Sequence, residues 1–194
     1  EDLEPLRGLS PRQLQAVNVV VFHSWEVSRH RIASVDFETR MVILTGPAPW
    51  SFFNWERTQR YVFENIPSQV DQPGEWSLDP EGTLLYRPLP GEDPATAEVV
   101  APVADSFVLI KGTPEPGKTV EHVAFRGLTF RHSRYVLPPE GHGDPQAAAS
   151  ISAVVLADCA RNVTIEDCRI ERIGIYGIWF RHGCHDCRVD RTAL

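Results

Sequence analysis

The pattern of hydrophobic and polar positions repeats along the second half of the chain. Residues 162–170 align with residues 186–194 at an offset of 24, and residues 122–130 align with residues 162–170 at an offset of 40. Each repeat carries three short apolar segments separated by turns, a pattern typical of stacked β-coils. The expected inward rows are Val108/Val154/Ile178, Ile110/Leu156/Phe180, Val123/Val163/Cys187, Phe125/Ile165/Val189, Leu128/Cys168/Thr192 and Phe130/Ile170/Leu194. The repeat predicts a parallel β-helix of about three coils over residues 103–194.

Polar two-residue turns join the second and third strands of each repeat. They are Arg126-Gly127, Glu166-Asp167 and Asp190-Arg191. Such corners need a left-handed backbone, which glycine and aspartate tolerate better than most residues. Because arginines share this strip, we expect Glu166 and Asp190 to form a solvated charge ladder and not a catalytic pair.

The first half of the chain reads as antiparallel strands. Residues 17–23 form a β-branched and aromatic run typical of a buried strand. A short helix is expected near residues 14–17, after Ser10 as N-cap and Pro11 at the first helical position. Two hairpins are predicted, one pairing residues 31–35 with 41–45 through Asp36 and one pairing residues 75–78 with 83–86 through the turn 79–82. Residues 1–102 are therefore expected to form a small β-sandwich or β-meander.

Composition divides the chain at the same place and excludes some functions. Residues 1–100 hold 15 acidic and 8 basic side chains, whereas residues 101–194 hold 11 of each. The net charge of −7 argues against a nucleic-acid-binding protein. No apolar run approaches the length that spans a bilayer, so no membrane partner is expected. The chain opens on Glu1 and not on methionine, so we expect that it does not begin where a gene begins, and a missing signal peptide says nothing about its destination.

Several motifs distributed over nearly the whole chain carry a family resemblance. They include Phe22-His-Ser-Trp25, Arg31-Ile-Ala-Ser-Val-Asp36, Pro73-Gly-Glu-Trp76, Arg126-Gly-Leu-Thr-Phe130 and Tyr176-Gly-Ile-Trp179. With these motifs the chain resembles bacterial right-handed parallel β-helix proteins of the glycoside-hydrolase-like type, in which a β-sandwich insert interrupts the helix. The resemblance implies an all-β fold, a secreted or periplasmic location, and a carbohydrate partner such as plant or microbial polysaccharide.

The resemblance also implies that coils are missing on either side of this chain. Catalytic acids of such proteins usually lie on later coils, so we expect glycosidase activity of the parent protein and none of these 194 residues alone. The alternative is a non-catalytic β-helix module that binds carbohydrate or has a structural role. Neither function implies a cofactor.

The longest interruption of the repeat, residues 131–150, is the predicted binding loop. Insertions between coils collect on one face, which is often the binding face. Trp179 is expected to point outward in a row with Leu109 and Val155, either as a platform for a sugar ring or beneath a covering element. The predicted substrate-binding residues are Trp179, Arg134, Tyr135, Glu140, His142 and Gln146.

Candidates for catalysis and for metal binding are few. Glycoside hydrolysis needs two carboxyl groups, and Asp144 on the loop with Asp158 at the end of a first strand is the better pair. Cys184 and Cys187 have zinc-like spacing, but Cys187 falls on an inward row and Cys184 does not, so no metal site is expected. A disulfide between Cys159 and Cys184 stays open.

An uncapped last coil would expose strand edges and the apolar stack beneath them. We therefore expect self-association at the C-terminal coil of this chain.

Overall fold

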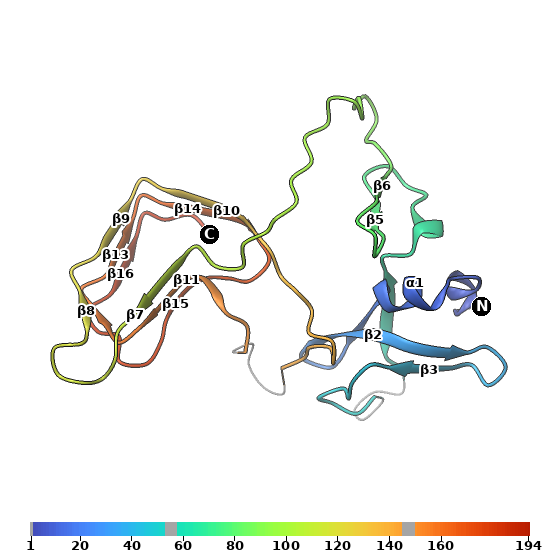
Figure 1. Ribbon diagram of the computed structural model, residues 1–194, viewed down its shortest axis with the longest axis horizontal. Coiled ribbons are helices and arrows are strands. Elements are labelled where there is room, and N and C mark those ends of the chain that lie inside the picture. Colours follow the sequence, from blue (N-terminus) through green and yellow to red (C-terminus); the bar gives the residue numbers. More distant parts are fainter. Residues whose placement is uncertain (1, 53–57, 145–149) are drawn as a thin grey trace. The chain divides into compact units, whose positions relative to one another are not determined.

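The computed structural model describes residues 2–52, 58–144 and 150–194 and divides the chain into two compact units (Figure 1). The first unit comprises Glu1–Glu98 and Leu137–Ala149, and the second comprises Val99–Val136 and Ser150–Leu194. The chain is mostly β with little helix, and it combines an antiparallel sheet with parallel sheets, as the sequence predicts. Among the described residues, no helix has the length and apolar character needed to cross a membrane.

The first unit is built on a four-stranded antiparallel sheet in the order β3-β2-β1-β4. The strands β1, β2 and β3 follow one another as a meander, and β4 returns to the far side of β1. A separate hairpin pairs β5 with β6, so both predicted hairpins are confirmed. The elements are η1 (Glu4–Leu6), α1 (Pro11–Ala16), β1 (Asn18–Phe22), β2 (Val27–Asp36), β3 (Met41–Leu44), β4 (Arg60–Glu64), η2 (Pro67–Gln69), β5 (Trp76–Leu78) and β6 (Leu84–Tyr86).

Local side-chain chemistry sets the ends of these elements. Ser10 and Gln13 form a capping box at the start of α1, which begins at Pro11 as the sequence predicts and ends at Ala16. The Asp36 carboxylate accepts hydrogen bonds from the backbone of Glu38 and Thr39, which closes the β2–β3 turn. The buried cluster beneath the sheet consists of Leu6, Val17, Val19, Val21, Ile32 and Ile66.

The second unit contains only parallel sheets (Figure 1). Strands of successive repeats pair in the orders β15-β11-β7, β12-β8, β16-β13-β9 and β10-β14. The strands are β7 (Val108–Lys111), β8 (Val120–Glu121), β9 (Ala124–Arg126), β10 (Thr129–Ser133), β11 (Ala153–Asp158), β12 (Ala160–Arg161), β13 (Thr164–Glu166), β14 (Arg169–Ile173), β15 (Tyr176–Phe180) and β16 (Arg188–Asp190).

The register of the second and third strands confirms the alignment of the repeats. Ile165 pairs with Phe125 on one side and Val189 on the other, and Phe130 pairs with Ile170. The corner residues Gly127, Asp167 and Arg191 all have positive φ, with values of 64°, 52° and 44°. The two-residue corners are therefore formed as the sequence predicts.

The predicted register of the first strands is wrong by one residue in the middle repeat. Val155, not Val154, pairs with Val108 and Ile178, and Ala157, not Leu156, pairs with Ile110 and Phe180. The offset between β11 and β15 is thus 23 residues, whereas the offset between β13 and β16 is 24. The turn after β15 holds the extra residue, and its Gly183 takes a φ of 68°.

All four cysteines are free thiols, which answers the open question of a bond between Cys159 and Cys184. The predicted outward position of Cys184 is also wrong, because Cys184 and Cys187 both pack against the buried cluster of Ile110, Ala157, Ala160 and Val163. Both thiols donate to backbone carbonyls, Cys184 to Ala157 and Cys187 to His185. These cysteines act as small apolar residues of the core.

Candidate functional site

The predicted site residues are divided between the two units. Glu140, His142 and Asp144 belong to the first unit, whereas Arg134, Tyr135, Asp158 and Trp179 belong to the second. Gln146 lies outside the described residues. The pairing of Asp144 with Asp158 stays a prediction.

The segment 137–144 pairs through its backbone with the N-terminal half of β2. The backbone of His142 exchanges two hydrogen bonds of 2.7 Å with the backbone of Arg29. A Cβ on Gly141 would lie 2.8 Å from both the Arg29 carbonyl oxygen and His30 Nδ1, so only glycine allows this approach. A Cβ on Gly143 would meet the Ser28 side chain at 2.8 Å. The segment therefore covers the two buried polar residues of β2.

Two histidines share one serine hydroxyl beneath this segment. His23 Nε2 and His30 Nε2 lie 2.8 Å and 2.9 Å from the Ser28 hydroxyl oxygen. The Gln59 amide nitrogen, at 3.0 Å, donates to His23 Nδ1, so His23 Nε2 carries the proton and donates to Ser28. The Ser28 hydroxyl then donates to His30, whose protonated Nδ1 has no partner among the described residues. This order of donors keeps both imidazoles neutral.

Glu26 is a buried carboxyl group beside these histidines. Its side chain is 10% exposed, and its Oε1 lies 3.5 Å from His23 Nε2. Neither oxygen has a hydrogen-bond partner of ordinary geometry among the described residues. Burial raises the pKa of Glu26, and the negative charge of Asp144 adds to the rise, although the Asp144 backbone N–H and the charge of His142 act against it.

Asp144 and two tryptophans complete this cluster. The Asp144 carboxylate lies 3.6 Å from His142 Nε2, and the Asp144 carbonyl accepts a hydrogen bond of 3.4 Å from Trp50 Nε1. Trp25 packs edge-on against Trp50 at 4.7 Å and is 49% exposed. A buried carboxyl group with a raised pKa, a second carboxylate and exposed aromatic surface are groups that a glycosidase site uses.

Sequence reasoning finds His142 and Asp144 but misses Glu26 as their neighbour. Glu26 and Asp144 are separated by more than 110 residues, and neither spacing nor periodicity relates them. Trp25 enters the sequence argument only through a family motif. The contact is a consequence of the backbone pairing between β2 and His142.

The pH dependence of stability should report the burial of Glu26. Because the folded pKa of Glu26 is raised, its contribution to stability is present below its ordinary value of 4.5 and is lost as pH rises through the folded pKa. Glu26→Gln is therefore expected to gain stability relative to the parent chain as pH rises above 4.5. Urea unfolding across the pH range measures this difference.

The matched control is Glu38→Gln, at an exposed position in the β2–β3 turn. Its stability relative to the parent chain is expected to change little over the same range. If the stability difference from the parent chain changed with pH in the same way for both variants, Glu26 would not be a buried carboxyl group without hydrogen-bond partners.

Trp179 lies in an outward row of the second unit, but one of its predicted neighbours in that row is wrong. Its register neighbours are Leu156 and Leu109, and not Val155. Tyr176 packs edge-on against Trp179 at 6.1 Å, and the Arg181 guanidinium lies 5.0 Å from the centre of the ring. This row combines an aromatic ring with a planar cation.

Two other predicted residues in this unit already have polar partners. Arg134 Nε donates to Asp105 Oδ1 at 2.7 Å. Asp158 Oδ1 lies 3.4 Å from Arg181 Nε. Both side chains therefore already form ion pairs, and the partner of Asp158 is the same Arg181 that lies over the Trp179 ring.

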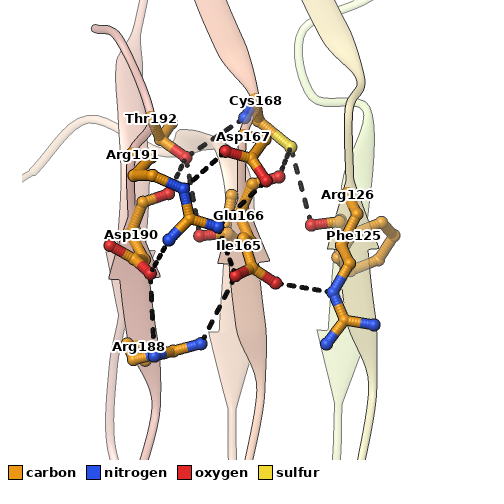
Figure 2. A network of polar contacts seen from close by, with 10 residues as sticks. All are labelled: Phe125, Arg126, Ile165, Glu166, Asp167, Cys168, Arg188, Asp190, Arg191 and Thr192. Carbon is orange, nitrogen blue, oxygen red and sulfur yellow. Dashed lines mark hydrogen bonds and ion pairs between the residues drawn. The ribbon is translucent and has the colours of Figure 1, made fainter.

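The corner residues form the predicted charge ladder (Figure 2). Glu166 accepts from Arg126 at 2.6 Å and from Arg191 at 2.5 Å. Asp167 accepts from Arg191 at 2.7 Å. The hydrogen bonds from these arginines lower the pKa of Glu166 and of Asp167. Carboxylates held ionised in this way cannot supply the proton that glycoside hydrolysis needs.

Within the described ranges, no group of three or more His, Cys, Asp or Glu side chains is arranged to hold a metal ion. Cys184 and Cys187 lie at the core with their thiols directed to carbonyl groups. The zinc-like spacing in the sequence therefore corresponds to packing positions.

Among known proteins, the likeness of this chain is to a solved structure and concerns the fold. The chain matches no family model and no curated protein. A solved structure described as "Glycoside hydrolase" superimposes on it with a TM-score of 0.75 and 22% sequence identity. The match covers 89% of this chain and 36% of that protein. At this identity the likeness is one of fold, and this chain is similar to about a third of a glycoside hydrolase.

Proposed function

We propose that this chain is part of a bacterial carbohydrate-active protein of the glycoside-hydrolase-like type. The observation that carries the proposal is the superposition of 89% of the chain on a glycoside hydrolase with a TM-score of 0.75. The substrate class is plant or microbial polysaccharide, and the parent protein works outside the cytoplasm, where such polymers are found.

Within this proposal the second unit is a right-handed parallel β-helix. Its support is the pairing of each strand with the equivalent strand of the next repeat in three- and two-stranded parallel sheets. Equivalent residues such as Phe125, Ile165 and Val189 lie side by side in those sheets. Stacked coils bury such rows as a continuous core.

Glu26 is the proposed general acid, because a carboxyl group with a raised pKa retains its proton closer to neutral pH. Asp144 is the proposed second carboxylate, since its charge acts directly on Glu26. Both carboxylates lie in this chain, but the chain spans only 36% of the protein that it matches, so the rest of the substrate-binding site is expected to come from other parts of the parent protein. Turnover of aryl glycosides is therefore expected of the parent protein and not of these residues alone.

Replacing Trp179 tests carbohydrate binding at the second unit. Trp179→Ala is expected to weaken binding on a glycan array by about ten-fold, which corresponds to the loss of one aromatic contact. Leu109→Ala is the control, because Leu109 lies in the same outward row and is 54% exposed but offers no ring.

The stability of Trp179→Ala separates the two interpretations of this row. A sugar platform can be removed at little cost, whereas a covered core aromatic costs about 3–5 kcal/mol when it is truncated. Unaltered glycan binding together with such a loss would show that Trp179 serves packing.

Self-association is expected at the last repeat of the 194-residue chain. β15 and β16 are edge strands of their sheets in the described part of the chain, and nearby Val189 and Leu194 are 42% and 78% exposed. Sedimentation velocity should reveal dimers at tens of micromolar, and Val189→Lys should return the chain to a monomer. A parent chain that is monomeric throughout would contradict the expectation.

A further inference from the structure

The first unit contains a groove that neither the sequence nor the fold comparison assigns. It lies over one face of the four-stranded sheet and has a volume of about 860 Å³. Its floor is apolar and lies on the same face of the sheet as the buried cluster of this unit. It is formed by Val19 and Val21 of β1, which belong to that cluster, and by Val42 and Leu44 of β3, which pack against it. Small-molecule sites typically measure about 300–1,000 Å³, so this groove is large enough for several sugar rings.

Aromatic rings stand along the groove. Phe37, Phe52, Tyr61 and Phe63 all line it. Tyr61 and Phe63 pack edge-on at 5.5 Å, and Tyr61 is 41% exposed. Exposed rings of this kind offer flat apolar surface to the C–H face of a sugar.

Polar side chains at the rim are held in place by one another. The Tyr61 hydroxyl donates to Asp2 at 3.0 Å, and Arg7 donates to Glu4 at 3.1 Å while its guanidinium lies 4.5 Å from the Phe37 ring centre. Gln59 is held by its hydrogen bond to His23. Rim groups that are fixed before binding lose less side-chain entropy when a ligand arrives.

Arg40 is the one rim cation without an ion-pair partner among the described residues. It is exposed and has a φ of 57° at the end of the β2–β3 turn. A planar guanidinium in this position can donate to two neighbouring hydroxyl groups at once. The rim thus combines an available donor with carboxylate acceptors.

The charges of the groove favour a neutral ligand. Among the described lining residues, Asp2 and Glu4 balance Arg7 and Arg40. Residues 1–100 carry 15 acidic and 8 basic side chains, so the surrounding field repels anions. An apolar floor, aromatic walls and planar polar rim groups without net charge match the surface of a neutral oligosaccharide.

We propose that this groove binds a neutral oligosaccharide and is a carbohydrate site separate from the Trp179 row. The inference rests on the proposed carbohydrate-active function and adds the place and the charge class of the ligand. Aromatic contact with Tyr61 provides the apolar part of the binding, and Arg40 provides directional hydrogen bonds.

Titration of the full 194-residue chain with neutral oligosaccharides of the xylo-, manno-, gluco- and galacto-series tests the proposal. Binding is followed by calorimetry and by chemical-shift changes. Tyr61→Ala and Arg40→Gln are each expected to weaken binding at the groove by about ten-fold. Arg12→Gln, on α1 and outside the groove, is the matched control and should bind as the parent chain does. Urea unfolding of each variant verifies that it is folded.

The outcomes separate the inference from the proposed function. If Trp179→Ala abolishes binding and the groove variants bind as the parent chain does, the groove site is overturned. The proposed carbohydrate-active function would then still stand. An absence of binding to every oligosaccharide would overturn both. Tighter binding of uronate-containing oligosaccharides would overturn the neutral class, and loss of self-association in Tyr61→Ala would identify a second copy of the chain as the occupant.

Discussion

Ile165→Ala is expected to lower the free energy of unfolding of the second unit by about 2–5 kcal/mol, in the upper part of that range. Ile165 is 0% exposed and lies between Phe125 and Val189 in the middle strand of its sheet. Its truncation leaves a cavity. The sheet cannot close that cavity, because β13 is hydrogen-bonded to β9 on one side and to β16 on the other. Urea unfolding followed by circular dichroism measures the loss.

Val189→Ala is the matched control for this substitution. Val189 lies in the same row but is 42% exposed, so its truncation is expected to cost less than about 1.5 kcal/mol. Equal losses in the two variants would mean that the middle repeat does not form the centre of the core.

The second large effect is expected at Asn65, which joins three segments of the first unit. Its Nδ2 donates to the carbonyls of Ala16 and Leu78 at 3.0 Å and 2.9 Å, and its Oδ1 accepts from the Leu78 backbone N–H at 2.7 Å. Its φ of 66° is in the left-handed region, which asparagine tolerates. Asn65→Ala should therefore cost about 3–4 kcal/mol, roughly 1 kcal/mol for each hydrogen bond and the remainder for strain.

Asn65→Gly distinguishes the contribution of the Asn65 hydrogen bonds to stability from the contribution of its backbone conformation. Glycine adopts the same φ without strain, so this variant should retain about 1 kcal/mol more stability than Asn65→Ala. If both variants unfold at the same urea concentration as the parent chain, Asn65 does not hold β5 to the sheet.

Several parts of the fold follow from local sequence patterns. The Asp36 and Asp79 turns, the Ser10 cap and the positive φ at Gly127 and Asp167 all agree with the sequence prediction. Each depends on residues within a few positions of one another, so the chemistry of the turn or cap is complete in the local sequence.

The first-strand register shows where such reasoning fails. An offset of 24 places Val154 and Leu156 in the rows, but Val155 and Ala157 occupy them. β11 is apolar at every position from Ala153 to Ala157, so alternation cannot identify its inward face. Only pairing with β7 and β15 decides it.

The sequence by itself determined the mostly β architecture, the repeat, and the turns that separate its strands. The alternation of side chains along a strand and the residue types of a turn both depend on residues that are close in the sequence. The tertiary structure alone decided that Glu26 belongs to the candidate site with Asp144. Backbone pairing of Arg29 with His142 brings Asp144 to Glu26 and excludes water from Glu26, which raises its pKa. A contact between residues so distant in the chain leaves no periodic signal, and burial is a property of everything that packs around a group.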